Sequence, residues 1–241
     1  MHKSNFFKPL VAASLLMLSA MTAFAQVNHS FYLMGTAPTG ESNSSIYIKD
    51  PSGLTMSPMG REDIGKGSAV GLGFNYRASY TFDIGYGEVM PFADVEFFWN
   101  RIKGSYRDEY DKARCTDPHY FNVPIMIGLQ YSYDITTLLK PYAELGIGYD
   151  LFFATAEGWK SDAAKPYFAY KIKGALAWQF GVGTYLGPHV SVGLTYYGLG
   201  KHMIDYKTSK CHYADACEFI NQNKTESRNV GLFALKVGFH L

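Results

Sequence analysis

The chain has 241 residues, with 22 basic and 21 acidic side chains and a formal net charge of +1. This near-neutral balance gives no support for a nucleic-acid partner. Aromatic residues make up 16% of the chain, including 19 Tyr and 17 Phe, and there are 24 glycines, a composition that favours a β protein.

The first 25 residues have the pattern of a secretory signal peptide. Two lysines precede an apolar run from Leu10 to Leu18, and Ala23-Phe24-Ala25 matches an A-x-A cleavage site. The sequence therefore predicts a signal peptide at 1–25 and a mature domain at 26–241. The apolar run is too short to span a bilayer, and no later run is long enough for a transmembrane helix.

Eight segments of the mature chain alternate between apolar and polar residues, which predicts β-strands. The facing of the first segment is ambiguous, whereas the alternation is clearest between Tyr120 and Phe153. There, two strands are joined too closely for a crossover helix and must form an antiparallel hairpin. The eight segments cover approximately 30–37, 67–82, 91–101, 120–135, 141–153, 167–186, 189–199 and a last stretch that ends at 241.

The connections between these strands alternate in length. Short turns follow the second, fourth and sixth strands, whereas about 38–66, 103–119 and 201–228 form long connections after the first, third and seventh. This alternation is typical of outer-membrane barrels, in which the long loops lie outside the cell. Because an open sheet edge in hydrocarbon leaves backbone groups unpaired, the last strand should pair with the first. We therefore predict an all-β fold, an eight-stranded antiparallel up-and-down transmembrane β-barrel (a meander) in the bacterial outer membrane.

The two faces of the predicted strands differ in charge. The apolar face carries aromatic residues near the strand ends, as membrane interfaces favour. Because eight strands leave an interior that side chains fill, we expect the charges of the opposite face to form salt bridges in a sealed lumen. The same alternation also fits a soluble, secreted, lipocalin-like carrier, which remains an alternative. The predicted lumen charges are Arg77, Asp94, Glu96, Glu144, Asp150, Lys171, Lys173 and Lys236.

Two runs of the sequence carry a resemblance to a known family. FNVPIMIGLQY followed by KPYAELGIGY, in a signal-bearing chain of eight alternating strands, resembles the outer-membrane β-barrel domain family of Gram-negative bacteria. That family includes OmpA-like and OmpX-like barrels and the PorT type linked to protein secretion. The resemblance implies that the barrel-assembly machinery reads the last strand, although Lys236 stands where a glycine is common. It also leaves a secretion-system component as an alternative function.

Three cysteines lie in predicted external loops, and an exported protein can form disulfides. Proximity in sequence favours a pair between Cys211 and Cys217, with Cys115 bonded to either of them as the alternative. A metal site from these two cysteines, His202 and His212 has irregular spacing, so we predict no metal and no cofactor.

An enzymatic role is the weaker interpretation of the sequence. His189-Val190-Ser191 has the H-x-S spacing used by lipid A deacylases, but it follows a short turn at the predicted periplasmic end, and Ser191 should point into the lumen. We therefore expect no enzyme, with lipid A modification as the alternative.

The long connections are rich in tyrosine, which is a good contact residue on a rigid scaffold. The leading hypothesis is a surface-interaction role with an unidentified extracellular or periplasmic protein partner. Arg101 and Lys103, at the outer rim of the third strand, are candidates to contact the phosphate of lipopolysaccharide.

Overall fold

The computed structural model describes residues 27–39, 68–102, 119–136, 138–155, 169–170, 173–207 and 225–241. In this part of the chain, no helix has the length and apolar character needed to cross a membrane.

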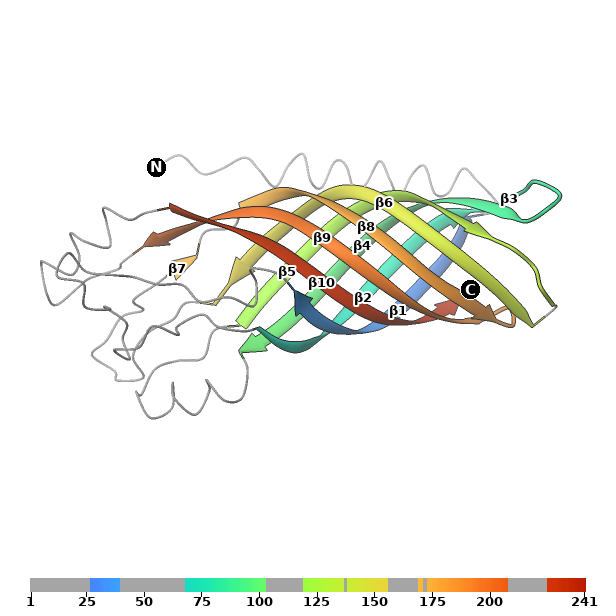
Figure 1. Cartoon of the computed structure of the whole chain (residues 1–241), viewed down its shortest axis with the longest axis horizontal. Coiled ribbons are helices and arrows are strands. Elements are labelled where there is room, and N and C mark those ends of the chain that lie inside the picture. Colours follow the sequence, from blue (N-terminus) through green and yellow to red (C-terminus); the bar gives the residue numbers. More distant parts are fainter. Residues whose placement is uncertain are drawn as a thin grey trace, which may run out of the picture.

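Eight long antiparallel strands close into a barrel (Figure 1). From the second long strand onward, each pairs with the long strand before it in the chain. The last, β10, also pairs with the first, β1, which closes the sheet. The two-residue strands β3 (Phe82–Asp83) and β7 (Ala169–Tyr170) extend the ladders of β4 and β9. The predicted eight-stranded meander is thus confirmed. The long strands are β1 (Val27–Thr39), β2 (Ser68–Tyr80), β4 (Glu88–Ile102), β5 (His119–Ser132), β6 (Leu139–Ala154), β8 (Lys173–Leu186), β9 (Val190–Lys207) and β10 (Thr225–His240).

The structure resolves the facing of β1, which the sequence leaves open. Ser30 and Thr36 are buried inside the barrel, and Phe31 and Leu33 are exposed outside it. The inner positions thus take the small polar residues of this strand and the outer positions take its large apolar ones.

Strands β9 and β10 extend further than the sequence pattern predicts. Residues up to Lys207 and from Thr225 are strand, although they were expected to lie in a long connection. A β-bulge interrupts the register, because Val230 pairs with Gly200 while the next residue pairs with Gly198. Gly200 has a φ of 83°, a left-handed conformation that favours glycine. The bulge shifts the inward set of β9 by one residue beyond this point.

The short turns gather at one end of the barrel, on the right in Figure 1, together with the C-terminus. The turn before β4 is closed by a hydrogen bond from the amide N of Ile84 to the carbonyl O of Gly87, and both Gly85 and Gly87 have positive φ angles. The strand ends that flank the long predicted connections are at the opposite end, and the connections themselves are mostly outside the described residues.

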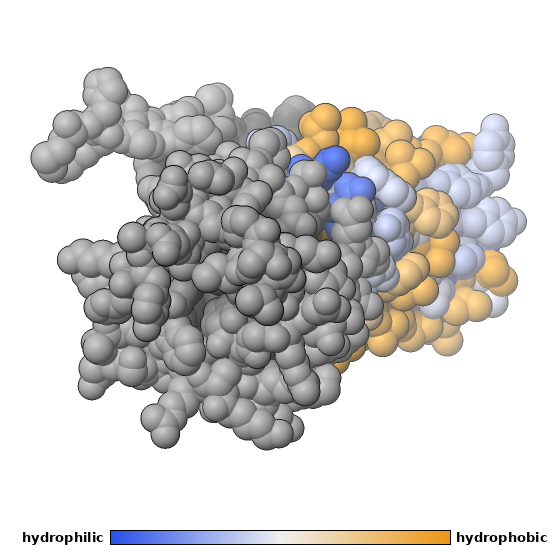
Figure 2. Space-filling model, turned by 60° about the vertical axis from the view of Figure 1, so that its left-hand side comes forward, coloured by the Kyte–Doolittle hydropathy of each residue, from blue (hydrophilic) through white to orange (hydrophobic). Residues whose placement is uncertain are grey.

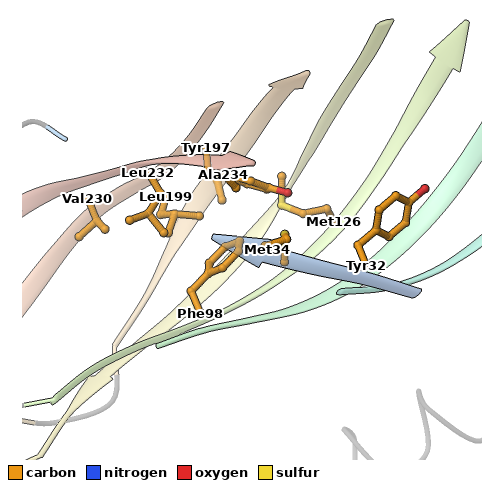
Figure 3. Packing of buried hydrophobic residues seen from close by; sticks show 10 residues of the cluster. Tyr32, Met34, Phe98, Met126, Tyr197, Leu199, Val230, Leu232 and Ala234 are labelled. Atoms are coloured by element: carbon orange, nitrogen blue, oxygen red, sulfur yellow. The ribbon is translucent and has the colours of Figure 1, made fainter. Parts of the chain in front are cut away.

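The interior contains an apolar cluster (Figure 3) in addition to its buried polar residues. On β4, Phe98 follows the buried Glu96, and on β10, Leu232 and Ala234 precede Lys236, so these three apolar residues are further from the short turns than Glu96 and Lys236 are. The cluster comprises Tyr32, Met34, Phe98, Met126, Ala177, Tyr197, Leu199, Val230, Leu232 and Ala234. The expectation of a charged lumen therefore describes only part of the interior.

Candidate functional site

The outer wall of the barrel is covered with large apolar side chains (Figure 2). Ile127 and Ile147, which are paired across β5 and β6, expose 60% and 65% of their surface. The inward residues of the same strands, such as Gln130 and Glu144, are buried. Soluble monomers rarely expose a contiguous apolar surface of this kind, so the wall requires an apolar covering.

Arg77 on β2 is at the centre of the buried charges and is 2% exposed. Its Nε and Nη2 atoms donate to the two carboxylate oxygens of Asp94, both at 2.8 Å. Its Nη1 atom donates to Oε2 of Glu144 at 2.7 Å and to Oε1 of Gln130 at 2.9 Å. Asp94 is directly opposite Arg77 in the ladder, which allows the two-pronged contact that makes arginine–carboxylate pairs strong.

Glu144 joins this arginine to a second cation. Its Oε1 atom accepts hydrogen bonds from Nζ of Lys236 and from the hydroxyl of Thr195, each at 3.0 Å. The cations also lie beside aromatic rings. Cζ of Arg77 is 3.8 Å from the ring centroid of Phe92, and Nζ of Lys236 is 5.3 Å from that of Tyr32, both within cation–π range.

Glu96 is buried near this group but has neutral partners. Its Oε1 atom accepts from the side-chain amide of Asn75 at 2.7 Å and from the hydroxyl of Tyr197 at 3.0 Å. Its Oε2 atom has no hydrogen-bond partner. Among the described ion pairs, none includes Glu96.

Asp150 and His202 form a separate buried contact nearer the long connections. Nε2 of His202 is 3.0 Å from Oδ2 of Asp150 and 2.8 Å from the carbonyl O of Leu199, and only the second contact has hydrogen-bond geometry. The ring of Phe152 lies 5.3 Å from the imidazole. A strict period of two along β9 would place His202 outside the barrel. The sequence pattern therefore did not predict His202 as an interior residue. A glycine within a strand pattern, here Gly200, is the signal that could have indicated the bulge.

The predicted lumen residues therefore have different outcomes. The structure brings together Arg77, Asp94, Glu144 and Lys236, and it places Glu96 and Asp150 inside the barrel with other partners. Lys173 begins β8, but its side chain is outside the described part of the structure. Five other residues with predicted roles also lie outside the described residues, so their roles stay predictions. They are Lys103, Lys171, Cys115, Cys211 and Cys217.

A polar cavity of about 470 Å³ opens at the short-turn end. Within it, Nζ of Lys140 is 2.6 Å from a carboxylate oxygen of Glu88 and 3.3 Å from one of Asp134. His240, which also lines the cavity, contacts the hydroxyls of Ser30 and Ser191, each at 2.8 Å.

His189 and Ser191, the two residues of the alternative H-x-S interpretation, each contact His240. The hydroxyl of Ser191 contacts the ring of His240, and Nδ1 of His189 lies 3.2 Å from the carbonyl O of His240. Ser191 is 1% exposed. Among the described residues, no three His, Cys, Asp or Glu side chains are placed to hold a metal ion.

At the other end, Arg101 is exposed on the outer wall. Its Cζ atom is 5.6 Å from the ring centroid of Trp99, and its cross-strand neighbour is His119. The contact with lipopolysaccharide phosphate that the sequence suggested for Arg101 stays a prediction.

These features define a class of fold, and the chain is structurally similar to small eight-stranded outer-membrane barrels. Similar solved structures include Neisserial surface protein A (16% identity, 89% of this chain and 96% of that chain, TM-score 0.43). OprG from Pseudomonas aeruginosa has 13% identity over 90% of this chain and 96% of that chain, with a TM-score of 0.44. A major outer membrane protein from Thermus thermophilus has 12% identity over 89% of this chain and 99% of that chain, with a TM-score of 0.47. No family model matches the chain, and no curated protein matches it in sequence.

Proposed function

We propose that the chain is an integral β-barrel of the bacterial outer membrane, with a closed interior and a non-enzymatic role in surface contacts. The observation that carries this proposal is the inversion of the usual distribution of side chains. Arg77, Asp94 and Glu144 are buried, whereas isoleucines and leucines are exposed over the wall. Hydrocarbon around the barrel makes this arrangement favourable, and water around it does not.

The dimensions of the strands support the same location. Strands β4 and β6 contain 15 and 16 residues. A tilted transmembrane strand needs about 9–11 residues to cross the hydrocarbon core. Both strands are therefore long enough to cross the core and reach the interfaces on either side.

The packing of the lumen supports a role other than conduction. Phe98, Tyr197 and Leu199 are fully buried inside the barrel, beyond the group centred on Arg77. Eight-stranded barrels have interiors that side chains fill. We infer that the barrel is an anchor and that its long connections make the functional contacts.

The sequence of those connections fits this role. Residues 40–67, 103–118 and 208–224 join strands at the end away from the short turns, and they include Tyr106, Tyr110 and Tyr213. Tyrosine offers a large amphipathic contact surface at a low cost in conformational entropy.

Two measurements test the proposal. The mature chain should fractionate with outer membranes and migrate differently in detergent gels before and after boiling, because a folded barrel resists detergent. Trypsin added to intact cells should cleave the segment 40–67, which contains Arg61 and Lys66, and leave the barrel intact. Recovery of the mature chain as a detergent-free soluble protein would contradict the proposal.

The alternatives have separate tests. Burial of Ser191 and its contact with His240 weigh against lipid A modification, and lipid A mass spectra from a deletion strain should therefore be unchanged. A PorT-type role would instead reduce protein secretion in that strain. The charged interior weighs against a lipocalin-like carrier, whose apolar side would be the inside.

A further inference from the structure

Arg101 and His119 form a paired site on the outer wall. They are directly opposite each other on β4 and β5, a spacing that brings side chains of one face into contact range. The ring of Trp99 is close to both side chains. This ring is nearly parallel to that of His119, with centroids 5.7 Å apart and an interplanar angle of 9°, and it lies 5.6 Å from Cζ of Arg101.

A hydrogen bond fixes the role of the imidazole. Nε1 of Trp99 lies 2.9 Å from Nδ1 of His119, and an indole N–H can only donate. Nδ1 therefore accepts, and the proton of the neutral ring is on Nε2. This leaves an N–H donor beside the planar donor set of Arg101. In the part of the chain that the structure describes, neither residue forms an ion pair with a carboxylate.

An aromatic surface continues below this pair on the same face. Phe121 is 6.5 Å from His119 and 5.0 Å from Phe153, in both cases with nearly parallel rings, and Phe97 is 5.8 Å from Phe121. The wall thus presents a cationic donor pair at the rim and an apolar strip beneath it. This order matches an amphiphile with an anionic head and apolar tails.

We propose that Arg101 and His119 bind the phosphate group of a membrane lipid in the leaflet nearest the long connections, with its acyl chain along Phe97, Phe121 and Phe153. This inference rests on the proposed membrane location. A lipid phosphate fits better than a free phosphate ion, because the donors are directly above the aromatic strip. Arginine presents a planar donor set that suits phosphate oxygens.

The chain offers a matched control for the charge. Lys201 on β9 is an exposed cation near the same end of the barrel, and its cross-strand neighbour is Asn229. Lys201→Gln removes one positive charge, as Arg101→Gln does, but leaves the paired site of Arg101 and His119 unchanged. Diffuse attraction of anionic lipid to the rim would depend on both residues equally.

The experiment uses the full mature barrel in detergent, with native mass spectrometry during titration of phosphatidic acid and of diacylglycerol with the same acyl chains. The wild-type barrel should retain one phosphatidic acid in preference to diacylglycerol. Arg101→Gln and His119→Gln should each weaken its retention about tenfold, the effect expected for a hydrogen bond to a charged group. Lys201→Gln should change it less than about twofold, as for an exposed charge outside the site.

Three results would overturn the assignment. They are equal losses in Arg101→Gln and Lys201→Gln, equal retention of the two lipids, and displacement of the lipid by inorganic phosphate at the same concentration. Heat-modifiable migration of every variant shows that its barrel is folded. A wild-type chain that is heat-modifiable and inserts in bilayers but shows no lipid preference refutes only this site. A chain that does not insert refutes the membrane proposal itself.

Discussion

At the scale of single residues, Arg77 is the cation on which the described interior depends most. It donates to Asp94, Gln130 and Glu144, which belong to three different strands. Removal of one member of a buried ion pair leaves its partner charged and unpaired, which is more destabilising than the loss of an exposed pair.

Arg77→Met should therefore lower the free energy of unfolding by about 3–5 kcal/mol. Urea unfolding of the barrel in vesicles measures this change, with tryptophan fluorescence as the signal. Arg101→Met is the matched control, because it removes an exposed guanidinium, and it should cost less than about 1 kcal/mol. Similar midpoints for the two variants would mean that the interior is wet.

Two buried glutamates permit a second comparison. Glu144 contacts both Arg77 and Lys236, whereas Glu96 accepts only from Asn75 and Tyr197 and has one unpartnered oxygen. Glu144→Gln should destabilise the barrel by about 3 kcal/mol or more, because two buried cations lose their shared carboxylate. Glu96→Gln should cost less than about 1 kcal/mol, because the neutral amide is cheaper to bury. The same urea titration separates the two variants, and the reverse order would contradict the contacts described here.

At the scale of elements, the β4–β5 ladder has a gap. Pairs are present up to Val95 with Ile125 and resume at Phe98 with Asn122. The two missing pairs would join Glu96 with Pro124 and Phe97 with Val123. Proline has no N–H to donate and is normally excluded from the middle of a sheet.

Pro124→Val should close this gap, because valine restores the N–H at a similar side-chain volume. We expect the free energy of unfolding to rise by about 1 kcal/mol, the net contribution of one hydrogen bond. Amide hydrogen exchange should slow in the neighbouring residues of β4. A less stable variant with unchanged exchange would show that the fixed φ of proline contributes more than the missing bond.

The outer wall allows a test in which only depth varies. Ile127, in the middle of β5, and Ile135, in the turn after it, expose 60% and 59% of their surface. In a bilayer, Ile127→Arg should cost about 2–4 kcal/mol and Ile135→Arg about 0–1 kcal/mol, because the penalty falls toward the interface. Folding yield into vesicles and urea midpoints measure both. Equal small costs would indicate that the wall faces water.

Strand alternation made most of this fold predictable, because most of the long strands have one apolar face, although β1 left its facing open in the sequence. The period of two failed where the backbone departed from it, at Gly200, and this concealed His202 inside the barrel. It also could not distinguish charged layers from apolar ones along the lumen. Phe98 and Tyr197 pack against each other from β4 and β9, which no local pattern relates.

At the scale of the whole molecule, the filled lumen predicts that the barrel does not conduct. Purified protein in planar bilayers should show no steady ionic current, because Phe98, Tyr197 and Leu199 are fully buried across the interior. A porin in the same bilayers provides the positive control. Stable single-channel steps from this protein would contradict the closed interior.

The shared carboxylate of Glu144 has a consequence for assembly. It receives Arg77 from β2, Thr195 from β9 and Lys236 from β10, so its full set of partners exists only once the first and last parts of the sheet have met. An intermediate with only part of the sheet inserted would place unpaired charges beside lipid tails. Membrane insertion and closure of the barrel should accordingly occur as one concerted event, so the kinetics of folding into vesicles should show a single phase.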